Sequence, residues 1–353
     1  MVADKLSMSG DDKAPFTKYV VDRGYFSENP MRIIDIGARG GVDKRWNLYW
    51  PHLEIIGFEP EPTECQRLNK IASEGLGPQQ CQKFYPLAIH RDRSLRPMYI
   101  TKHPQCSSFL RPDMEFAKRF RRFNESLDDN PIEVVDTVDC LTIDLDTFAR
   151  ENGIDYVDFI KIDVEGAELA VLEGGEQLIT KSACGVLLEV YFQAFHESQP
   201  LFSEIDALAR RLGFVLFQLD SFSLRRKDWQ DSSPLPAYEF EEGQVYSGDA
   251  LYFRDIVAEL RSDRFSIQSH ALVKVLKLAS LAELFNLQDV SVELLLNAQA
   301  VGMLSEGDVG KMVDLLTPQQ TDVFKLTKAG YRKLLPPFLR TKVRELLDRF
   351  LSA

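Results

Sequence analysis

The stretch Ile33-Ile34-Asp35-Ile36-Gly37-Ala38-Arg39-Gly40-Gly41 decides the fold of this chain. A buried strand that runs into a glycine turn is how α/β domains bring their backbone close to a nucleoside. A second apolar run follows and stops at Glu59, 24 residues past Asp35. An acid at that place can accept hydrogen bonds from ribose hydroxyls. The pattern predicts a nucleoside-binding crossover between two strands.

The third residue of the turn separates two classes of nucleoside. In the dinucleotide fingerprint G-x-G-x-x-G, the second glycine lets pyrophosphate approach the backbone. That position is Arg39 here, so binding of NAD or FAD loses support. S-adenosylmethionine has no pyrophosphate. Its amino and carboxylate groups need a turn with free backbone N–H groups and a nearby acid, and Asp35 suits the second need. A nicotinamide-dependent oxidoreductase stays the alternative.

Composition excludes several other classes of protein. A net charge of −12 and a pI near 5.1 argue against a nucleic-acid-binding protein, which normally shows a basic surface. The five cysteines include no CxxC pair, which favours free thiols in a reducing compartment over a disulfide framework or a zinc site. No signal peptide and no transmembrane segment is expected. The expected location is the cytoplasm.

The order of apolar runs predicts an α/β domain with a mostly parallel sheet and helices on both faces. It occupies residues 31–255, after an N-terminal extension at 1–30 with a mobile start (1–14) and a short helix (15–25). Strands are expected at 32–36, 54–58, 83–89, 156–164, 185–191, 214–219 and 250–253. Helices are expected at 44–50, 62–73, 146–152, 167–180 and 202–212.

The C-terminal part, 256–353, is predicted to be an all-helical unit, with helices at 270–287, 291–300, 305–316 and 340–351. Apolar residues recur there at helical spacing: Leu294, Leu295, Leu296, Met303 and Met312. Packing of the helices against one another is the simplest interpretation. The alternative is a module for homo-oligomerisation or for docking a partner.

Residues 90–135 interrupt the alternation of strands and helices. A long insertion in a compact α/β domain is typical of a lid or a binding loop. The alternative is a surface excursion with its own helix at 113–123. The aromatic residues Tyr191, Phe192 and Phe195 either pack under this insertion or form an apolar floor for an acceptor.

A second group of ionisable residues lies in the apolar strand near 159–168. Alternation along a strand places Lys161, Asp163 and Glu165 on one side. A buried parallel strand is normally apolar on both faces, so these charges are costly unless they are paired or end in a crevice. Asp163 falls where the strand should end, beside the cleft that ligands use. The alternative is a structural Lys161–Asp163 pair that caps the helix starting near Gly166.

These motifs together resemble the FkbM family of S-adenosylmethionine-dependent methyltransferases. The resemblance is carried by 35–41, by Phe58-Glu59-Pro60 and by 159–175, where the family's K-x-D-x-E-G-x-E run matches at Lys161, Asp163, Glu165, Gly166 and Glu168. It covers about 30–255 and implies a class I methyltransferase-like (Rossmann-like) fold and O-methylation of hydroxyls in sugars, polyketides or related natural products. The helical tail is outside the family core.

The resemblance implies roles for residues of the donor site. Asp35, Gly37 and Gly41 would line the methionine end, Glu59 would hold the ribose, and Asp163 would face donor and acceptor. The full set of candidate cofactor-binding residues is Asp35, Gly37, Ala38, Arg39, Gly41, Glu59, Ala88, Ser108 and Asp163.

A sugar hydroxyl is a poor acid, so a base or a metal should assist its methylation. The candidates for the base are Asp163, Glu189 at the end of the next strand, and His196 in the loop after it. Asp163 and Glu189 could also hold one Mg²⁺ with water in the remaining positions. The alternatives are a Glu189 paired with a cation and a surface His196. The acceptor is expected to be a small molecule or a glycan. A silent methyltransferase-fold scaffold is the third hypothesis.

Overall fold

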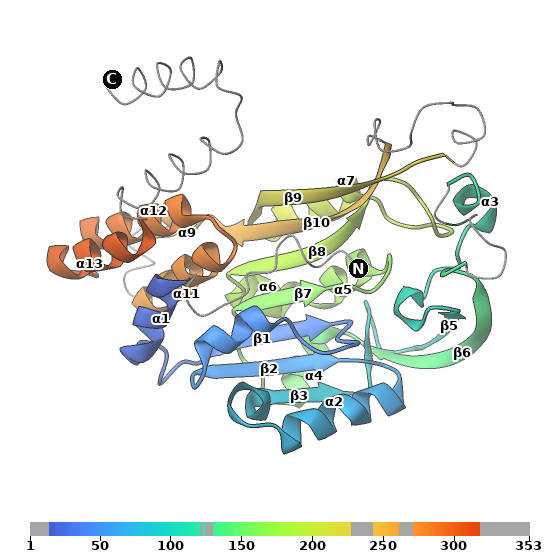
Figure 1. Ribbon diagram of the computed structural model, residues 1–353, viewed down its shortest axis with the longest axis horizontal. Helices are drawn as coiled ribbons and strands as arrows, with labels where there is room; N and C mark the ends of the chain where they lie inside the picture. The colour runs from blue at the N-terminus through green and yellow to red at the C-terminus, as the bar shows by residue number, and fades with distance from the viewer. Residues whose placement is uncertain (1–13, 121–122, 124–129, 227–242, 261–270, 318–353) are drawn as a thin grey trace, which may run out of the picture.

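The computed structural model describes residues 14–120, 123, 130–226, 243–260 and 271–317 (Figure 1). The expected mobility of 1–13 and the helix expected at 340–351 lie outside these residues. The first helix, α1 (Pro15–Asp22), falls within the range predicted for it.

The main sheet has seven strands in the order β3-β2-β1-β7-β8-β10-β9 (Figure 1). The parallel strands are β1 (Met31–Ile36), β2 (Leu53–Phe58), β3 (Gln82–Tyr85), β7 (Phe159–Ile162) and β8 (Gly185–Tyr191). The antiparallel pair β9 (Phe214–Leu224) and β10 (Gln244–Arg254) completes the sheet. The strand order reverses between β1 and β7, which is where ligands bind in open α/β sheets. The expected α/β, class I methyltransferase-like fold is confirmed.

Helices cover both faces of the sheet because successive strand residues alternate between two apolar cores. Ile33 packs into a core with α1, the 3₁₀ helix Lys44–Tyr49 and the C-terminal helices, whereas Ile34 packs into the opposite core. That second core receives α4 (Leu145–Glu151), α5 (Glu168–Gly174), α6 (Glu176–Ser182) and α7 (Phe202–Arg211). The helix α2 (Pro62–Glu74) packs beside β3 in a smaller cluster.

The C-terminal helices α9 (Ile256–Leu260), α11 (Ala271–Leu284), α12 (Gln288–Ala300) and α13 (Glu306–Leu316) share the first of these cores. Leu294, Leu295 and Met312 are at most 1% exposed, so core packing is confirmed for them, whereas Leu296 is 50% exposed. These helices lie at the amino ends of the parallel strands, away from the expected crevice (Figure 1).

Two buried polar contacts join α11 to the rest of the fold. The Lys277 ammonium lies 2.7 Å from Asp158, just before β7. The Glu283 carboxylate accepts hydrogen bonds from the backbone N–H groups of Phe16 (3.0 Å) and Thr17 (2.6 Å), at the start of α1. Because an unpaired buried charge is strongly destabilising, these contacts fix the helical unit against the sheet.

The residues predicted as a third strand, 83–89, belong to two sheets. β3 ends at Tyr85, and β4 (Ala88–Ile89) joins a separate three-stranded sheet with β6 (Val134–Ile143) and β5 (Leu95–Thr101). Pro86 has no N–H group to continue a ladder, which fits the break between them. The insertion is therefore built around the antiparallel β5–β6 pair.

Several other predicted elements differ in length, among them β9 and β10, which extend beyond the expected 214–219 and 250–253. The helix expected at 167–180 is two helices that meet at Gly175, and the strand expected at 156–164 is limited to β7. Of the helix expected at 113–123, only α3 (Met114–Ala117) forms in the described residues. Within the described part of the chain, no helix is both long and apolar enough to cross a membrane. None of the five cysteines, which all lie in the described residues, forms a disulfide, as predicted.

Candidate functional site

The turn after β1 and the end of β7 are in direct backbone contact at Gly37. This residue has a φ of +87°, and a Cβ atom there would lie 1.8 Å from the carbonyl oxygen of Asp163. Only glycine combines that conformation with so close an approach. The Asp163 N–H group also donates to the Ile36 carbonyl at 3.0 Å. Two motifs about 125 residues apart in the sequence therefore form one site at the switch point of the sheet.

The backbone N–H groups of the glycine turn are largely occupied. Those of Gly37 and Ala38 donate to the Phe58 carbonyl at 3.1 and 3.0 Å, and that of Gly41 donates to the Ala38 carbonyl at 3.0 Å. The Gly40 N–H group donates to Glu64 at 3.0 Å. The prediction that the turn offers free N–H groups to a ligand is therefore wrong at these four positions. Its role is to bring backbone and side chains of neighbouring strands together.

Lys161 lies between the two acids of the donor site. Its ammonium is 3.5 Å from Asp35 and 3.0 Å from Asp163, so the Lys161–Asp163 pair considered from the sequence is present. Burial raises the pKa of Asp35 to about 6, against the opposing effect of Lys161, and both acids raise the pKa of Lys161. The Asp163 side chain remains 45% exposed, which leaves it accessible to a ligand.

Glu59 lies at the end of β2, where the sequence places the ribose-binding acid. Its Oε1 atom accepts from the Glu61 N–H group at 2.9 Å and lies 3.5 Å from the Arg39 guanidinium. Burial raises the pKa of Glu59. Arg39 thus points toward Glu59. Both of these contacts use Oε1.

Three carboxylates gather at the ends of β7 and β8. One ligand atom from each of Asp163, Glu165 and Glu189 lies within 4.8 Å of the others. We call these three residues the acidic cluster. Burial and the neighbouring acids raise the pKa of Glu189 well above its usual range. Among the described residues Glu189 forms no ion pair, so the predicted alternative of a cation partner is not seen in that part of the chain.

Tyr191 joins two members of the acidic cluster. Its hydroxyl lies 2.8 Å from Glu189 Oε2 and 3.0 Å from Glu165 Oε2. A phenol has one proton to donate, so it can serve both carboxylates only if one of them carries a proton and donates back. This role was missed in the sequence, where Tyr191 was considered only as part of an aromatic group.

The turn that carries Asp163 and Glu165 has an unusual backbone. Glu165 has a φ of +56°, and Gly166 has a φ of +104°. The buried Glu168 carboxylate stabilises this turn by accepting from the N–H groups of Val164 (3.1 Å) and Gly166 (3.0 Å). Burial raises its pKa to about 7. Non-glycine residues with a positive φ are rare and cluster at functional sites.

Asp249 on β10 is a further acid that the sequence did not single out. It lies opposite Glu189 in the register of β8 and β10, so both side chains leave the same face of the sheet. Burial, together with Asp163, raises the pKa of Asp249 to about 6. Its position depends on antiparallel register, which a local pattern does not reveal.

His196 is buried rather than on the surface, at 4% exposure, so the alternative of a surface loop histidine is wrong. Neither ring nitrogen has a hydrogen-bond partner among the described residues. Burial lowers its pKa to about 4, so the ring is neutral near pH 7. The ring meets Tyr191 edge to face at a centroid distance of 6.5 Å.

Four other candidates occupy supporting positions. The Ser108 hydroxyl donates to the Glu165 carbonyl at 2.7 Å and so ties the insertion to the acidic cluster. Ala38 is buried in the apolar cluster beside α2. Gly41 lies near the same cluster, because a Cβ atom added to it would have Leu68 Cδ2 as its nearest neighbour, at 3.8 Å. Ala88 is buried in β4, in the second sheet.

The aromatic residues after β8 mostly support the insertion. Phe195 is 1% exposed and its ring contacts those of Phe116, Phe120, Phe123 and Tyr246. Phe192 packs against Phe202 of α7. The structure therefore favours core packing for these two residues over a floor for the acceptor.

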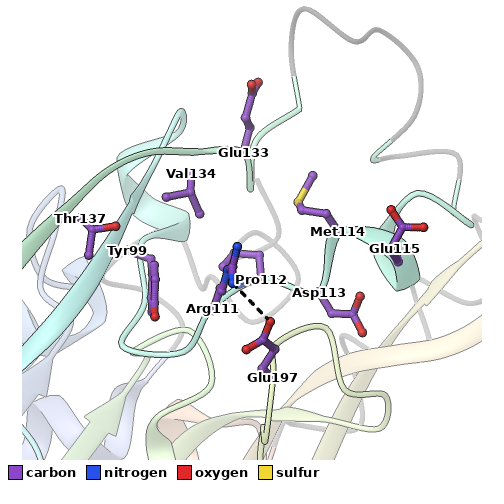
Figure 2. Close-up of a pocket in the computed structure, with 10 residues that line it drawn as sticks. All are labelled: Tyr99, Arg111, Pro112, Asp113, Met114, Glu115, Glu133, Val134, Thr137 and Glu197. Atoms are coloured by element: carbon purple, nitrogen blue, oxygen red, sulfur yellow. Dashed lines mark ion pairs between the residues drawn. The ribbon is translucent and has the colours of Figure 1, made fainter.

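A pocket of about 650 Å³ opens between β5, β6, α3 and the loop after β8 (Figure 2). Figure 2 shows Tyr99, Val134 and Thr137 on the strand side, and Arg111 and Glu197 side by side as an ion pair. The whole lining is Tyr99, Arg111, Pro112, Asp113, Met114, Glu115, Glu133, Val134, Thr137 and Glu197.

Comparison with known families and sequences shows that this chain is similar to methyltransferases. The model of the methyltransferase FkbM domain matches residues 35–216. The 2-O-methyltransferase NoeI of Sinorhizobium fredii (strain NBRC 101917 / NGR234) is 30% identical over 185 residues, which cover 50% of this chain and 70% of that protein. Methyltransferase sdnD of Sordaria araneosa is 25% identical over 245 residues, covering 61% of this chain and 89% of that one.

Two solved structures align with this chain at low identity. Methyltransferase FkbM from Methylobacillus flagellatus KT is 13% identical, covers 64% of this chain and 43% of its own, and has a TM-score of 0.30. Magnesium protoporphyrin IX methyltransferase (ChlM) from Synechocystis PCC 6803 with bound SAM is 10% identical, covers 70% and 86%, and has a TM-score of 0.33.

Proposed function

Because the chain belongs to the FkbM methyltransferase family, we propose that it transfers the methyl group of S-adenosylmethionine to a hydroxyl group of a sugar or a related natural product. The observation that carries this proposal is the meeting of Asp35, Glu59 and Asp163 at adjacent strand ends, on either side of the switch point. The relative named as a 2-O-methyltransferase supports oxygen as the acceptor atom. The free cysteines support a cytoplasmic location.

The donor would lie across the ends of β1 and β2. Asp35 would hold the ammonium group of the methionine part, because a carboxylate pairs well with a cation. Glu59 would accept a hydrogen bond from a ribose hydroxyl through Oε2, because its contacts with Glu61 and Arg39 both use Oε1. Gly37 lets the backbone after β1 pass close to the Asp163 carbonyl, which keeps Asp35 and Asp163 at the same edge of the sheet.

The chemical step is an in-line displacement. The acceptor oxygen forms a bond to the methyl carbon while the carbon–sulfur bond breaks, the sulfur keeps the electron pair, and the hydroxyl proton passes to a carboxylate. We assign this proton to Asp163, which is 45% exposed, belongs to the acidic cluster and shares Lys161 with Asp35. Glu189 is the second candidate. His196, with its pKa of about 4, is a weak base near pH 7.

Lys161 pairs with one of the three carboxylates of the acidic cluster, Asp163, and there are two ways to supply further positive charge. One is a proton shared through Tyr191, which contacts both Glu165 and Glu189. The other is Mg²⁺, for which three carboxylates and added waters are suitable ligands. The tyrosine contacts favour the proton. We expect 5 mM EDTA to change the initial rate of methyl transfer by less than about twofold. A large loss that added Mg²⁺ restores would assign the cluster to the metal.

The affinity for the product S-adenosylhomocysteine is expected to fall as pH falls through about 6. The pKa of Asp35 is raised to about 6, so at pH 5 only about one tenth of this carboxylate is ionised and able to pair with the ligand ammonium. The dissociation constant should be about tenfold larger at pH 5 than at pH 7.5. Calorimetric titration measures it. In Asp35→Asn the same pH change should have little effect, whereas an unchanged pH dependence would remove Asp35 from the ammonium site.

The proposed function is tested with the full chain, methyl-labelled S-adenosylmethionine and a panel of neutral, amino-bearing and anionic sugars. Transfer of label to an oxygen of any sugar supports the proposal. Binding of NAD in place of S-adenosylhomocysteine would favour the oxidoreductase alternative. Failure to bind either nucleoside would favour a silent scaffold.

A further inference from the structure

The pocket in Figure 2 is joined to the ends of β7 and β8 by two sets of hydrogen bonds. On one side, the Asp113 N–H group donates to the Phe195 carbonyl and the Glu197 N–H group donates to the Arg111 carbonyl, both at 2.8 Å. Pro112 and His196 form a bridge between them. Residues 195–197 follow the carboxyl end of β8, which carries Glu189. The pocket is therefore linked, through the loop that lines it at Glu197, to the strand that carries Glu189.

The second connection runs through the insertion. Tyr99 and Ser108 exchange backbone hydrogen bonds at 2.8 and 3.2 Å. The Ser108 hydroxyl donates to the carbonyl of Glu165, a member of the acidic cluster. A molecule in the pocket would thus rest on the same two segments that position Glu165 and Glu189.

The pocket lining carries more negative than positive charge. The lining includes four acids and one basic residue. The acids are Asp113, Glu115, Glu133 and Glu197, and the basic residue is Arg111. The nearest cations are loosely placed, with Arg111 4.0 Å from Glu197, Lys102 4.0 Å from Glu133 and Lys118 3.9 Å from Glu115. These distances exceed those of charge-assisted hydrogen bonds, so the carboxylate oxygens can still accept from the hydroxyl or ammonium groups of a ligand. With Lys102 and Lys118 counted beside Arg111, the acids still exceed the cations by one, which disfavours an added anion.

Apolar surface lies between these charges. Tyr99, which is partly buried, and Val134 come from neighbouring strands, and Met114 lies opposite them at the start of α3 (Figure 2). An aromatic ring beside hydrogen-bonding carboxylates suits a sugar, which has both an apolar face of C–H groups and a rim of hydroxyls. A volume of about 650 Å³ is within the range of small-molecule sites.

We propose that this pocket binds the acceptor and selects neutral or amino-bearing sugars over anionic ones. The inference rests on the proposed function, because it takes the acceptor to be a sugar. Tyr99 supplies the stacking surface. Glu133 and Glu197 accept from hydroxyl or ammonium groups and disfavour carboxylate, phosphate or sulfate substituents.

Met114 provides a direct reporter of the pocket. The full chain is labelled with ¹³C at the methionine methyl groups, and the Met114 signal is assigned from its loss in Met114→Leu. Methyl α-D-glucopyranoside, D-glucosamine and D-glucuronate are titrated at equal ionic strength. We expect saturable shifts of the Met114 signal with the first two sugars and at least tenfold weaker binding of glucuronate. The Met312 signal, from the C-terminal core, should not change.

Two variants test the residues named. Tyr99→Ala should weaken binding of the neutral sugar at least tenfold without changing the affinity for S-adenosylhomocysteine. Glu197→Lys should reduce the discrimination against glucuronate at least fivefold, whereas Glu293→Lys, an exposed acid on α12, should leave it unchanged. The inference is overturned if the Met114 signal does not shift with any of the three sugars. It is also overturned if glucuronate binds as tightly as the neutral sugar.

The failure of this inference is distinguishable from failure of the proposed function. Methyl transfer to a sugar with no response at Met114 would retain the function and reject the pocket. A response at Met114 without methyl transfer to any sugar would retain a sugar-binding pocket and reject the function.

Discussion

Replacing Asp163 by alanine is expected to abolish methyl transfer while leaving the fold intact. The side chain is 45% exposed and pairs with Lys161, which keeps its second partner Asp35 at 3.5 Å. Its removal leaves no uncompensated buried charge, so the free energy of unfolding should change by about 1 kcal/mol or less. The proton acceptor of the reaction is lost, and kcat should fall by about 10³-fold. Initial rates with labelled S-adenosylmethionine and thermal unfolding measure the two effects.

Two further variants separate chemistry from charge pairing. Asp163→Asn keeps the size of the side chain but accepts no proton, so it should be as inactive as the alanine variant. Asp155→Ala removes another exposed acid that pairs with a basic residue, Arg32 at 3.4 Å, near the amino end of β7. That control should keep full activity. Full turnover by Asp163→Ala would reject Asp163 as the catalytic residue and leave Glu189 as the candidate.

The parts of the fold that local patterns determine were predicted well. β1, β2 and β8 begin and end within one residue of the expected strands, because each is a largely apolar run. The contact between the 35–41 turn and Asp163 also follows from the sequence, since the carboxyl ends of parallel strands lie at the same edge of a sheet. Those patterns locate the donor site without any knowledge of long-range contacts.

The parts that depend on distant partners were not predictable. The four N–H groups of the glycine turn are occupied because Phe58 and Glu64 approach from β2 and α2, which no local pattern reports. Tyr191 and Glu189 lie two residues apart on one strand, and that spacing places them on one face. Their contact with Glu165 depends on the positive φ of that residue. The Glu189–Asp249 pair likewise needs antiparallel register.

Gly37→Ala is the second change with a large expected effect. An added Cβ would lie 1.8 Å from the Asp163 carbonyl oxygen, and alanine strains the backbone at a φ of +87°. Overpacking and strain of this kind together cost about 2–5 kcal/mol of unfolding free energy. The turn can relieve the clash only by moving β1 away from β7. Since Asp35 and Asp163 lie on those two elements, we expect at least a 100-fold loss of S-adenosylhomocysteine affinity, equivalent to about 2.7 kcal/mol.

Gly40→Ala provides the matched control for this change. Gly40 has nearly the same φ, +85°, but nothing lies within 4 Å of a Cβ atom there. Its substitution therefore imposes the strain of the left-handed backbone, about 1–2 kcal/mol, without the clash. Unfolding in urea and calorimetric titration of both variants separate the two effects. If Gly37→Ala lost no more stability or affinity than Gly40→Ala, the close approach of β1 to Asp163 would not be what holds the donor site together. If the losses differ as expected, the glycine at 37 is required by contact between two strands and not by the turn alone.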